Sequence, residues 1–199
     1  MHGAIQESKH IFIDAGLKSF THKYNRDKIQ ILEIGFGSGL NAFLSYEFAE
    51  KNGNHISYEG IENHPVELDL IDQLNYPDII DIENGKETFL NMHKCMAGVK
   101  LKMTGNFDFT RHECAFSDFK HNEKADIVFF DPFDASVDAN FWESAYLGSL
   151  YNLMNDQGIL ITYGAKGSFK RALKAVGFKV EGIAGPPGKR EITRAWKAF

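Results

Sequence analysis

Short apolar runs alternate with longer amphipathic stretches along the chain. Apolar runs bounded by polar, glycine or proline residues are typical of strands. They predict strands over 29–34 (IQILEI), 55–61 (HISYEGI), 107–113 (FDFTRHE), 125–130 (ADIVFF), 158–163 (GILITY), 177–183 (GFKVEGI) and 190–197 (REITRAWK). Stretches with helical spacing predict helices over 39–51, 65–74, 86–96, 138–154 and 167–176. Strands that alternate with helices form βαβ units, so we expect an α/β fold with a mostly parallel, seven-stranded sheet.

The two ends of the chain depart from this alternation. The last two predicted strands flank AGPPGK, a loop too short for a parallel crossover, so we expect an antiparallel C-terminal hairpin. Residues 1–24 precede the first core strand, and we interpret them as a flap or edge segment. Residues 25–199 would then form one domain, which is long enough to bury a hydrophobic core.

The composition is that of a globular chain, with 43% hydrophobic and 25% charged residues among 199. No apolar run approaches the roughly 18 residues of a membrane helix. The N-terminus lacks the pattern of a signal peptide, so we expect a cytoplasmic protein without membrane contact. Cys95 and Cys114 are then free thiols. The histidines and cysteines lack the spacing of metal ligands, and we expect no metal.

Charge is distributed unevenly along the sequence. The formal net charge is −5, yet residues 164–199 carry nine Lys or Arg residues against two acidic ones. This surplus indicates a basic C-terminal face that could meet a polyanion such as nucleic acid. A solvated helix beside a charged edge strand is the alternative explanation.

The sequence LEIGFGSGLN, where the first predicted strand ends, carries the first candidate site. Gly35, Gly37 and Gly39 alternate with other residues, and Glu33 precedes them. Leu40 stands where a dinucleotide-binding turn needs glycine, and a phosphate-binding loop would need Lys-Ser/Thr. The pattern instead favours S-adenosylmethionine, whose methionine and ribose portions a glycine backbone can approach closely. The Glu33 carboxylate would support the turn or meet the methionine amino group. A strand–helix turn without a ligand is the alternative.

The next two strand ends provide further candidate cofactor contacts. Glu62 ends the second strand, where an acid accepts hydrogen bonds from ribose hydroxyls, a feature that NAD enzymes share. Glu113 ends the third strand, where its carboxylate could accept the adenine amine while the Cys114 backbone reads the edge of the ring. A surface acid in front of a loop is the alternative for Glu113.

The fourth strand ends in FFDPFDA, the strongest chemical signal of the chain. Asp131 at the strand tip can accept a hydrogen bond from an amine N–H or take its proton as a general base. Either role directs the nitrogen lone pair at a methyl group held nearby. Pro132 fixes the turn, and Phe133 can stack on a planar substrate. Tyr163 ends the fifth strand, where it either lines the substrate pocket or packs in the core.

Taken in order, these motifs resemble the methyltransferase domain of the bifunctional tRNA 5-methylaminomethyl-2-thiouridine biosynthesis enzymes and related single-domain proteins. The matching segments are GAIQESKHIFI, EIGFGSGLN, IENHP, FFDPFDA and the block from LITYGAKGSFK to GKREITRA. The resemblance implies a Rossmann-like fold, S-adenosylmethionine as the cofactor, and methylation of the aminomethyl nitrogen of a modified wobble uridine in tRNA. It also implies that Asp131 acts on the amine and that Lys189 and Arg190 lie near the tRNA or the rim of the active site.

Three features of the sequence depart from that family's pattern and bear on the predicted substrate. Pro132 replaces a glycine, so the turn resembles the Asp/Asn-Pro-Pro-aromatic turn of amino-group methyltransferases. The chain starts later than is usual in the family, and it shows no flavin-dependent oxidase domain, so another enzyme would supply the amine. An amino-group methyltransferase for a small amine, another RNA base or a protein is therefore an alternative. A cofactor- or tRNA-binding subunit without catalysis is another, whereas Leu40 disfavours an NAD oxidoreductase.

Overall fold

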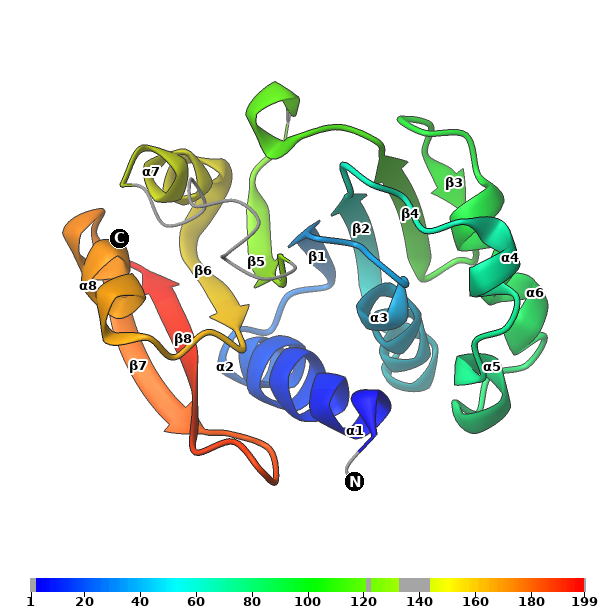
Figure 1. Ribbon diagram of the computed structural model, residues 1–199, viewed down its shortest axis with the longest axis horizontal. Coiled ribbons are helices and arrows are strands. Elements are labelled where there is room, and N and C mark those ends of the chain that lie inside the picture. The colour runs from blue at the N-terminus through cyan, green and yellow to red at the C-terminus, as the bar shows by residue number, and fades with distance from the viewer. Residues whose placement is uncertain (1–2, 121–122, 133–143, 199) are drawn as a thin grey trace.

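The computed structural model describes residues 3–120, 123–132 and 144–198, which form a twisted sheet with helices on both faces (Figure 1). Within these residues the sheet has eight strands in the order β3-β4-β2-β1-β5-β6-β8-β7. The strands are β1 Lys28–Ile34, β2 His55–Ile61, β3 Leu101–Lys102, β4 Phe107–His112, β5 Ala125–Phe130, β6 Met154–Thr162, β7 Phe178–Ala184 and β8 Glu191–Lys197. This architecture confirms the predicted Rossmann-like α/β fold.

The centre of the sheet is parallel, and the strand order reverses beside β1. β1 pairs in parallel with β2 on one side and with β5 on the other. The chain extends the first half through β2 and β4, then returns to add β5 and β6. In open α/β sheets, ligands bind at the carboxyl ends of the strands where the order reverses. Here that point lies between the ends of β1 and β5.

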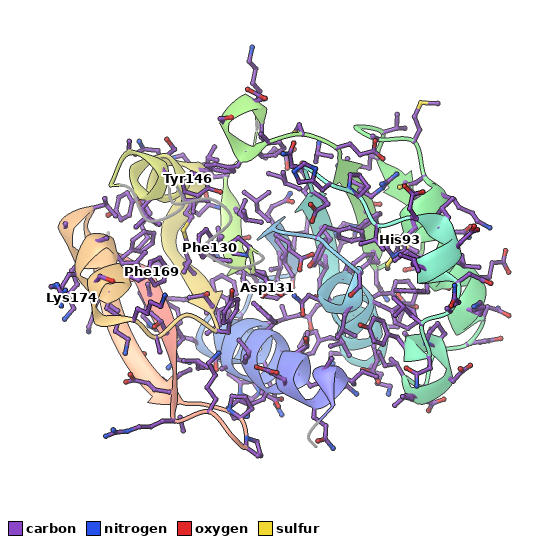
Figure 2. All side chains as sticks on the ribbon, in the orientation of Figure 1. His93, Phe130, Asp131, Tyr146, Phe169 and Lys174 are labelled. Carbon is purple, nitrogen blue, oxygen red and sulfur yellow. The ribbon has the colours of Figure 1, made fainter. Side chains whose placement is uncertain are left out.

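Side chains of β5 alternate between two hydrophobic clusters, as a strand buried on both faces requires. The helical segments are α1 Ala4–Ser8, η1 Lys9–Lys18, α2 Ser19–Lys23, α3 Leu40–Asn52, α4 Leu68–Ile71, α5 Tyr76–Ile79, α6 Gly85–Lys94, η2 Phe116–Asp118, α7 Ser144–Leu153 and α8 Gly167–Ala175. Ile127 and Phe129 join the cluster under the N-terminal helices, α3 and α6. Val128 and Phe130 join the cluster under α7 and α8, where Phe130 stacks on Phe169 (Figure 2).

The predicted antiparallel C-terminal hairpin is confirmed. β8 lies between β6 and β7 and pairs with both of them in antiparallel fashion. The described sheet has one strand more than predicted, because β3 pairs with Phe109 and Asp108 at the opposite edge. A strand of two residues is too short to show a polar–apolar alternation, so the sequence pattern does not reveal it.

The helix predicted over 65–74 is wrong in its extent. The segment forms only the single turn α4, in which Leu68 and Leu70 stay 44% and 56% exposed and Ile71 is buried. One buried side chain gives a longer helix too little packing to be stable. The helix predicted over 138–154 is observed as α7, and its predicted start lies outside the described residues. Within the described ranges, no helix combines the length and the apolar character that a membrane span requires.

Residues 4–23 form three consecutive helical segments that pack against the sheet (Figure 1). Four apolar side chains of this region are at most 2% exposed and share one cluster with β1 and β5: Ile11, Phe12, Leu17 and Phe20. Arg194 of β8 also donates a hydrogen bond from Nη1 to the oxygen of Ala15 at 3.2 Å. The division of the chain at residue 24 stays a prediction, but this segment contributes to the same core as the sheet.

We expect truncation of Leu17 to destabilise the whole protein. Leu17 is 0% exposed, so Leu17→Ala should lower the free energy of unfolding by about 2–5 kcal/mol. The side chain of the neighbouring Lys18 is 53% exposed, and Lys18→Ala should change this free energy by less than about 0.5 kcal/mol. Urea denaturation of the two variants measures the difference. Equal stabilities would show that the N-terminal helices are only loosely attached.

Candidate active site

Three glycines shape the turn that follows β1. Gly35, Gly37 and Gly39 have φ angles of 90°, 52° and 74°, in the left-handed region that other residues enter at a cost. Gly35 is restricted further, because a Cβ atom there would lie 2.5 Å from the backbone oxygen of Asp131. The glycine turn therefore lies in direct backbone contact with the tip of β5.

A phenylalanine and a histidine fill the space behind the turn. Phe36 packs on His93 with 5.2 Å between ring centroids, and a Cβ atom at Gly39 would lie 2.8 Å from His93 Nε2. His93 belongs to α6 (Figure 2), and burial lowers its pKa to about 4, so the ring is neutral at physiological pH. No sequence motif pointed to His93. Its role is to support the turn from the side of α6.

Glu62 holds the turn from the end of β2. Its Oε2 atom accepts a hydrogen bond from Gly37 N at 2.9 Å, and its Oε1 atom accepts one from His64 N at 2.8 Å. Each carboxylate oxygen has a second lone pair, so Glu62 can still accept hydrogen bonds from ligand hydroxyls. The backbone N–H of Glu62 donates to His112 O at the end of β4. Glu62 thus connects the turn with two strand ends.

A polar network joins the end of β1 to the end of β5. In the first turn of α3, Asn41 Nδ2 donates hydrogen bonds to Glu33 Oε1 at 2.8 Å and to Asp131 Oδ2 at 3.0 Å. The Tyr58 hydroxyl donates to Glu33 Oε2 at 2.7 Å. Glu33 is fully buried, and burial holds its pKa well above the usual range. Both of its oxygens are engaged inside the protein, which fits the supporting role considered for this residue.

Asp131 lies at the tip of β5 beside the N-terminal helices (Figure 2) and opens onto a cavity of about 300 Å³. Burial raises the pKa of Asp131 to about 7, although the hydrogen bond from Asn41 opposes this shift. A carboxyl group with such a pKa exchanges its proton near neutral pH, as a general base in a binding cavity must. The catalytic role of Asp131 stays a prediction, and its burial and its place in the cavity are compatible with it.

Other predicted substrate contacts surround the same cavity. Pro132 and Tyr163 line it, and the Tyr163 hydroxyl donates a hydrogen bond to Pro132 O at 3.0 Å. Lys189 Nζ lies 4.5 Å from the centre of the Tyr163 ring, and its charge lowers the pKa of Asp131. The structure thus brings together side chains from the ends of β5 and β6 and from the β7–β8 loop.

Two predicted substrate contacts are placed less directly. Arg190 is exposed and follows Lys189 in the loop between β7 and β8. Because β8 runs antiparallel to β6 and to β7, this loop lies at the edge of the sheet where β6 ends. Arg190 is therefore at the edge that carries Asp131. Phe133 lies outside the described residues.

The predicted adenine contacts, Glu113 and Cys114, follow β4 directly. The Glu113 side chain is 45% exposed and forms an ion pair with Arg111 at 2.7 Å. Cys114 is half-buried, and burial raises the pKa of its thiol. Glu62 N donates a hydrogen bond to His112 O, and Glu113 and Cys114 directly follow His112, so both residues lie at the strand end beside the ribose candidate. They remain predicted contacts.

The site contains features that suit S-adenosylmethionine. The left-handed glycines leave bare backbone where a ligand can approach. Asn41 Oδ1 is buried and has no hydrogen-bond partner among the residues that the structure describes. Such an acceptor fits a ligand ammonium group, because buried polar atoms in proteins are nearly always hydrogen-bonded. In the described part of the chain, no group of three or more His, Cys, Asp or Glu side chains could hold a metal ion.

Family membership decides between the possible cofactors. Residues 90–198 match the sequence profile of a family described as S-adenosyl-L-methionine-dependent methyltransferase. The chain belongs to this family. The cofactor of this methyltransferase is therefore S-adenosylmethionine, as the glycine turn predicted.

Individual relatives of the methyltransferase confirm the resemblance drawn from its motifs. The tRNA 5-methylaminomethyl-2-thiouridine biosynthesis bifunctional proteins MnmC of Leptospira borgpetersenii serovar Hardjo-bovis and Aromatoleum aromaticum are 27% and 26% identical over 94% and 96% of this chain. The chain spans 30% and 31% of the length of these relatives. The crystal structure of MNMC2 from Aquifex aeolicus has a TM-score of 0.75 at 21% identity, over 98% of this chain and 61% of that one, which shows a shared fold.

Because the pKa of Asp131 is raised, we expect its contribution to the free energy of unfolding to fall as pH rises. A group whose pKa is raised on folding contributes stability that is fully present below its unfolded pKa and is lost as pH rises through its folded pKa. For Asp131 this window runs from 3.8 to about 7. Asp131→Asn cannot ionise, so its stability relative to the parent protein should rise across the window, by about 1.4 kcal/mol per pKa unit.

Urea denaturation of both proteins across this pH range measures the effect. The exposed acid Asp14 provides the control, because Asp14→Asn removes the same charge from the surface. A stability difference between Asp131→Asn and the parent that does not change with pH would mean that Asp131 titrates like a surface carboxyl.

Proposed function

We propose that this methyltransferase acts on tRNA and methylates the aminomethyl nitrogen of a modified wobble uridine, converting 5-aminomethyl-2-thiouridine to 5-methylaminomethyl-2-thiouridine. One observation carries the proposal: Asp131, with a pKa raised to about 7, opens onto a cavity beside the glycine turn. Similarity to proteins named for the biosynthesis of this nucleoside supports the same substrate.

The chemistry needs a nitrogen with a free lone pair, which an alkylammonium lacks. Asp131 can take one ammonium proton, because burial raises its pKa toward neutrality. The hydrogen bond from Asn41 fixes the carboxylate, so the freed lone pair keeps one direction. When bound, S-adenosylmethionine supplies a methyl carbon on a positively charged sulfur, which keeps the electron pair of the broken S–C bond.

The glycine turn and the adjoining strand ends are the proposed cofactor site. Bare backbone and hydrogen-bond acceptors there suit the methionine, ribose and adenine portions of the cofactor. The proposed contacts are Gly35, Gly37, Gly39, Glu62, Glu113 and Cys114. Glu33 supports this site indirectly, because it accepts a hydrogen bond from Asn41 and fixes that side chain. The unpartnered Asn41 Oδ1 is an additional proposed contact for the cofactor's ammonium group.

The walls of the cavity suit a planar base. Its lining includes Pro132, Tyr163, and Ile11 and Phe12 of η1. Apolar and aromatic walls stack on unpaired bases, which is how proteins commonly read single-stranded RNA. Phe133, which follows Pro132, is a further proposed contact with the base.

Basic side chains at the same edge of the sheet suit tRNA phosphates. Lys166 is exposed between the end of β6 and the start of α8, and Lys189 and Arg190 lie in the β7–β8 loop. The strand directions place all three at the edge where β5 ends. Because phosphate contacts come largely from Lys and Arg, we propose that tRNA approaches along this edge.

Removing the Asp131 carboxylate should stop methyl transfer and spare cofactor binding. Asp131→Ala lacks the proton acceptor, so we expect the rate to fall by about 10²–10⁴-fold. The affinity for S-adenosylhomocysteine should stay close to that of the parent. The assay combines purified protein, S-adenosylmethionine and tRNA that carries the unmethylated aminomethyl nucleoside, and mass spectrometry detects the added methyl group on the wobble uridine.

Small alkylamines, bulk protein and unmodified tRNA serve as competing acceptors in the same assay. Asp14→Asn is the matched control, because it removes an exposed carboxylate outside the cavity. Methylation of a competing acceptor without methylation of the wobble nucleoside would contradict the tRNA substrate. Normal turnover by Asp131→Ala would contradict the role of the carboxylate.

Charge reversal at the active-site edge should weaken tRNA binding more than the same change at the opposite edge. The test variant combines Lys166→Glu with Arg190→Glu. The control combines Lys174→Glu with Lys179→Glu, which are exposed near the end of α8 (Figure 2) and the start of β7.

In the test variant, we expect a higher KM for tRNA and a salt dependence whose slope falls by about one per lost phosphate contact. Turnover of the free aminomethyl nucleoside should not change. Equal effects of the two pairs of substitutions on the KM for tRNA would contradict the proposed approach of the tRNA.

A further inference from the structure

A second carboxylate faces the cavity that contains Asp131. On the side of the N-terminal helices, the cavity is lined by Ala4, Glu7, Ser8, Ile11 and Phe12. Glu7 lies in α1, is exposed, and lines the same cavity as Asp131. Its position is set by α1, which packs against η1 and α3. The cavity lining therefore contains acidic groups from two separate parts of the chain.

The two carboxylates influence each other through the cavity. Burial is the main cause of the raised pKa of Asp131, and the negative charge of Glu7 adds to it, whereas Asn41 and Lys189 act in the opposite direction. Like charges that share a site repel, and a cation between them relieves the repulsion. Among the residues that the structure describes, no ion pair and no side-chain hydrogen bond is formed by the Glu7 carboxylate.

The charges around the cavity favour a ligand with one positive charge. When ionised, Asp131 and Glu7 carry two negative charges, and Lys189 beside Tyr163 supplies one positive charge. An alkylammonium group has three N–H donors and can bond to two carboxylates at once, whereas a hydroxyl of similar size has one donor and no charge. The cavity can therefore distinguish an amine from an alcohol.

We propose that Glu7 binds the ammonium form of the acceptor and makes the enzyme selective for cationic alkylamines over neutral analogues of the same shape. This role rests on the proposed methylation of an aminomethyl group. Glu7 pairs with the ammonium before reaction, and one proton moves from nitrogen to Asp131. The nitrogen lone pair then forms the N–C bond as the S–C bond breaks. Glu7 pairs with the resulting secondary ammonium, and Asp131 releases its proton to solvent.

The direct test compares the binding of an amine with that of its alcohol. With S-adenosylhomocysteine present, calorimetry measures the affinities of 5-aminomethyluridine and 5-hydroxymethyluridine, and of benzylamine and benzyl alcohol as a simpler pair. Glu7→Gln keeps the size of the side chain and should reduce the preference for the amine by about two- to fivefold, the range expected of an exposed ion pair. Glu7→Asp should retain most of the preference.

A carboxylate of the same N-terminal helical region provides the matched control. Asp14 is exposed and does not line the cavity, so Asp14→Asn should keep the full preference for the amine. With tRNA as the substrate, Glu7→Gln should raise KM more than it lowers kcat. The acid limb of its pH–rate profile should move to lower pH, because loss of the Glu7 charge lowers the pKa of Asp131. A purely structural role of Glu7 would not produce this shift.

The possible outcomes test the role of Glu7 and the proposed function separately. Full preference for the amine in Glu7→Gln, or no preference in the parent protein, overturns the role of Glu7. A Glu7-dependent preference in a protein that does not methylate the wobble nucleoside supports Glu7 and overturns the tRNA substrate. Methylation of the tRNA together with a preference for the amine that does not depend on Glu7 supports the tRNA substrate and overturns the role of Glu7.

Discussion

The amide group of Asn41 is the constraint on which the rest of the site depends. Its two N–H donors reach Glu33 at the end of β1 and Asp131 at the end of β5, so one side chain holds together two strand ends and the start of α3. The glycine turn must pass directly beside this junction, and a Cβ atom at Gly35 would collide with the backbone of Asp131. Turn, amide and carboxylate therefore form one unit, whose parts cannot be moved independently.

Burial divides the carboxylates around this unit into separate roles. Glu33 is fully buried, has a strongly raised pKa and receives hydrogen bonds from Tyr58 and Asn41, which suits a structural anchor. Asp131 opens onto the cavity and has a pKa of about 7, which suits proton exchange. Glu62 accepts hydrogen bonds from backbone N–H groups and fixes the turn. Similar side chains thus suit different tasks because their surroundings differ.

The sequence predicts the parts of this structure that are encoded locally. The glycine spacing, the acids at the strand ends and the Asp-Pro turn predict the edge of the sheet at which the cofactor binds. Each of these motifs is a short run of neighbouring residues, so the sequence shows it directly. Asn41 lies within LEIGFGSGLN, but its bond to Asp131 spans 90 residues and follows only from the order of the strands. The packing of α6 and α1 positions His93 and Glu7, and such packing corresponds to no local sequence motif. The helix predicted over 65–74 fails for a related reason, because helical spacing alone does not show that Leu68 and Leu70 stay exposed.

A crystal structure with bound S-adenosylhomocysteine would locate the methyl transfer relative to Asp131, because the sulfur atom of this ligand marks the position from which the methyl group departs. We expect this sulfur beside the glycine turn, facing the cavity that contains Asp131, with the ribose hydroxyls at Glu62 and the Asn41 amide still bonded to Glu33 and Asp131. A ligand bound elsewhere on the sheet, or a sulfur atom turned away from Asp131, would contradict this expectation.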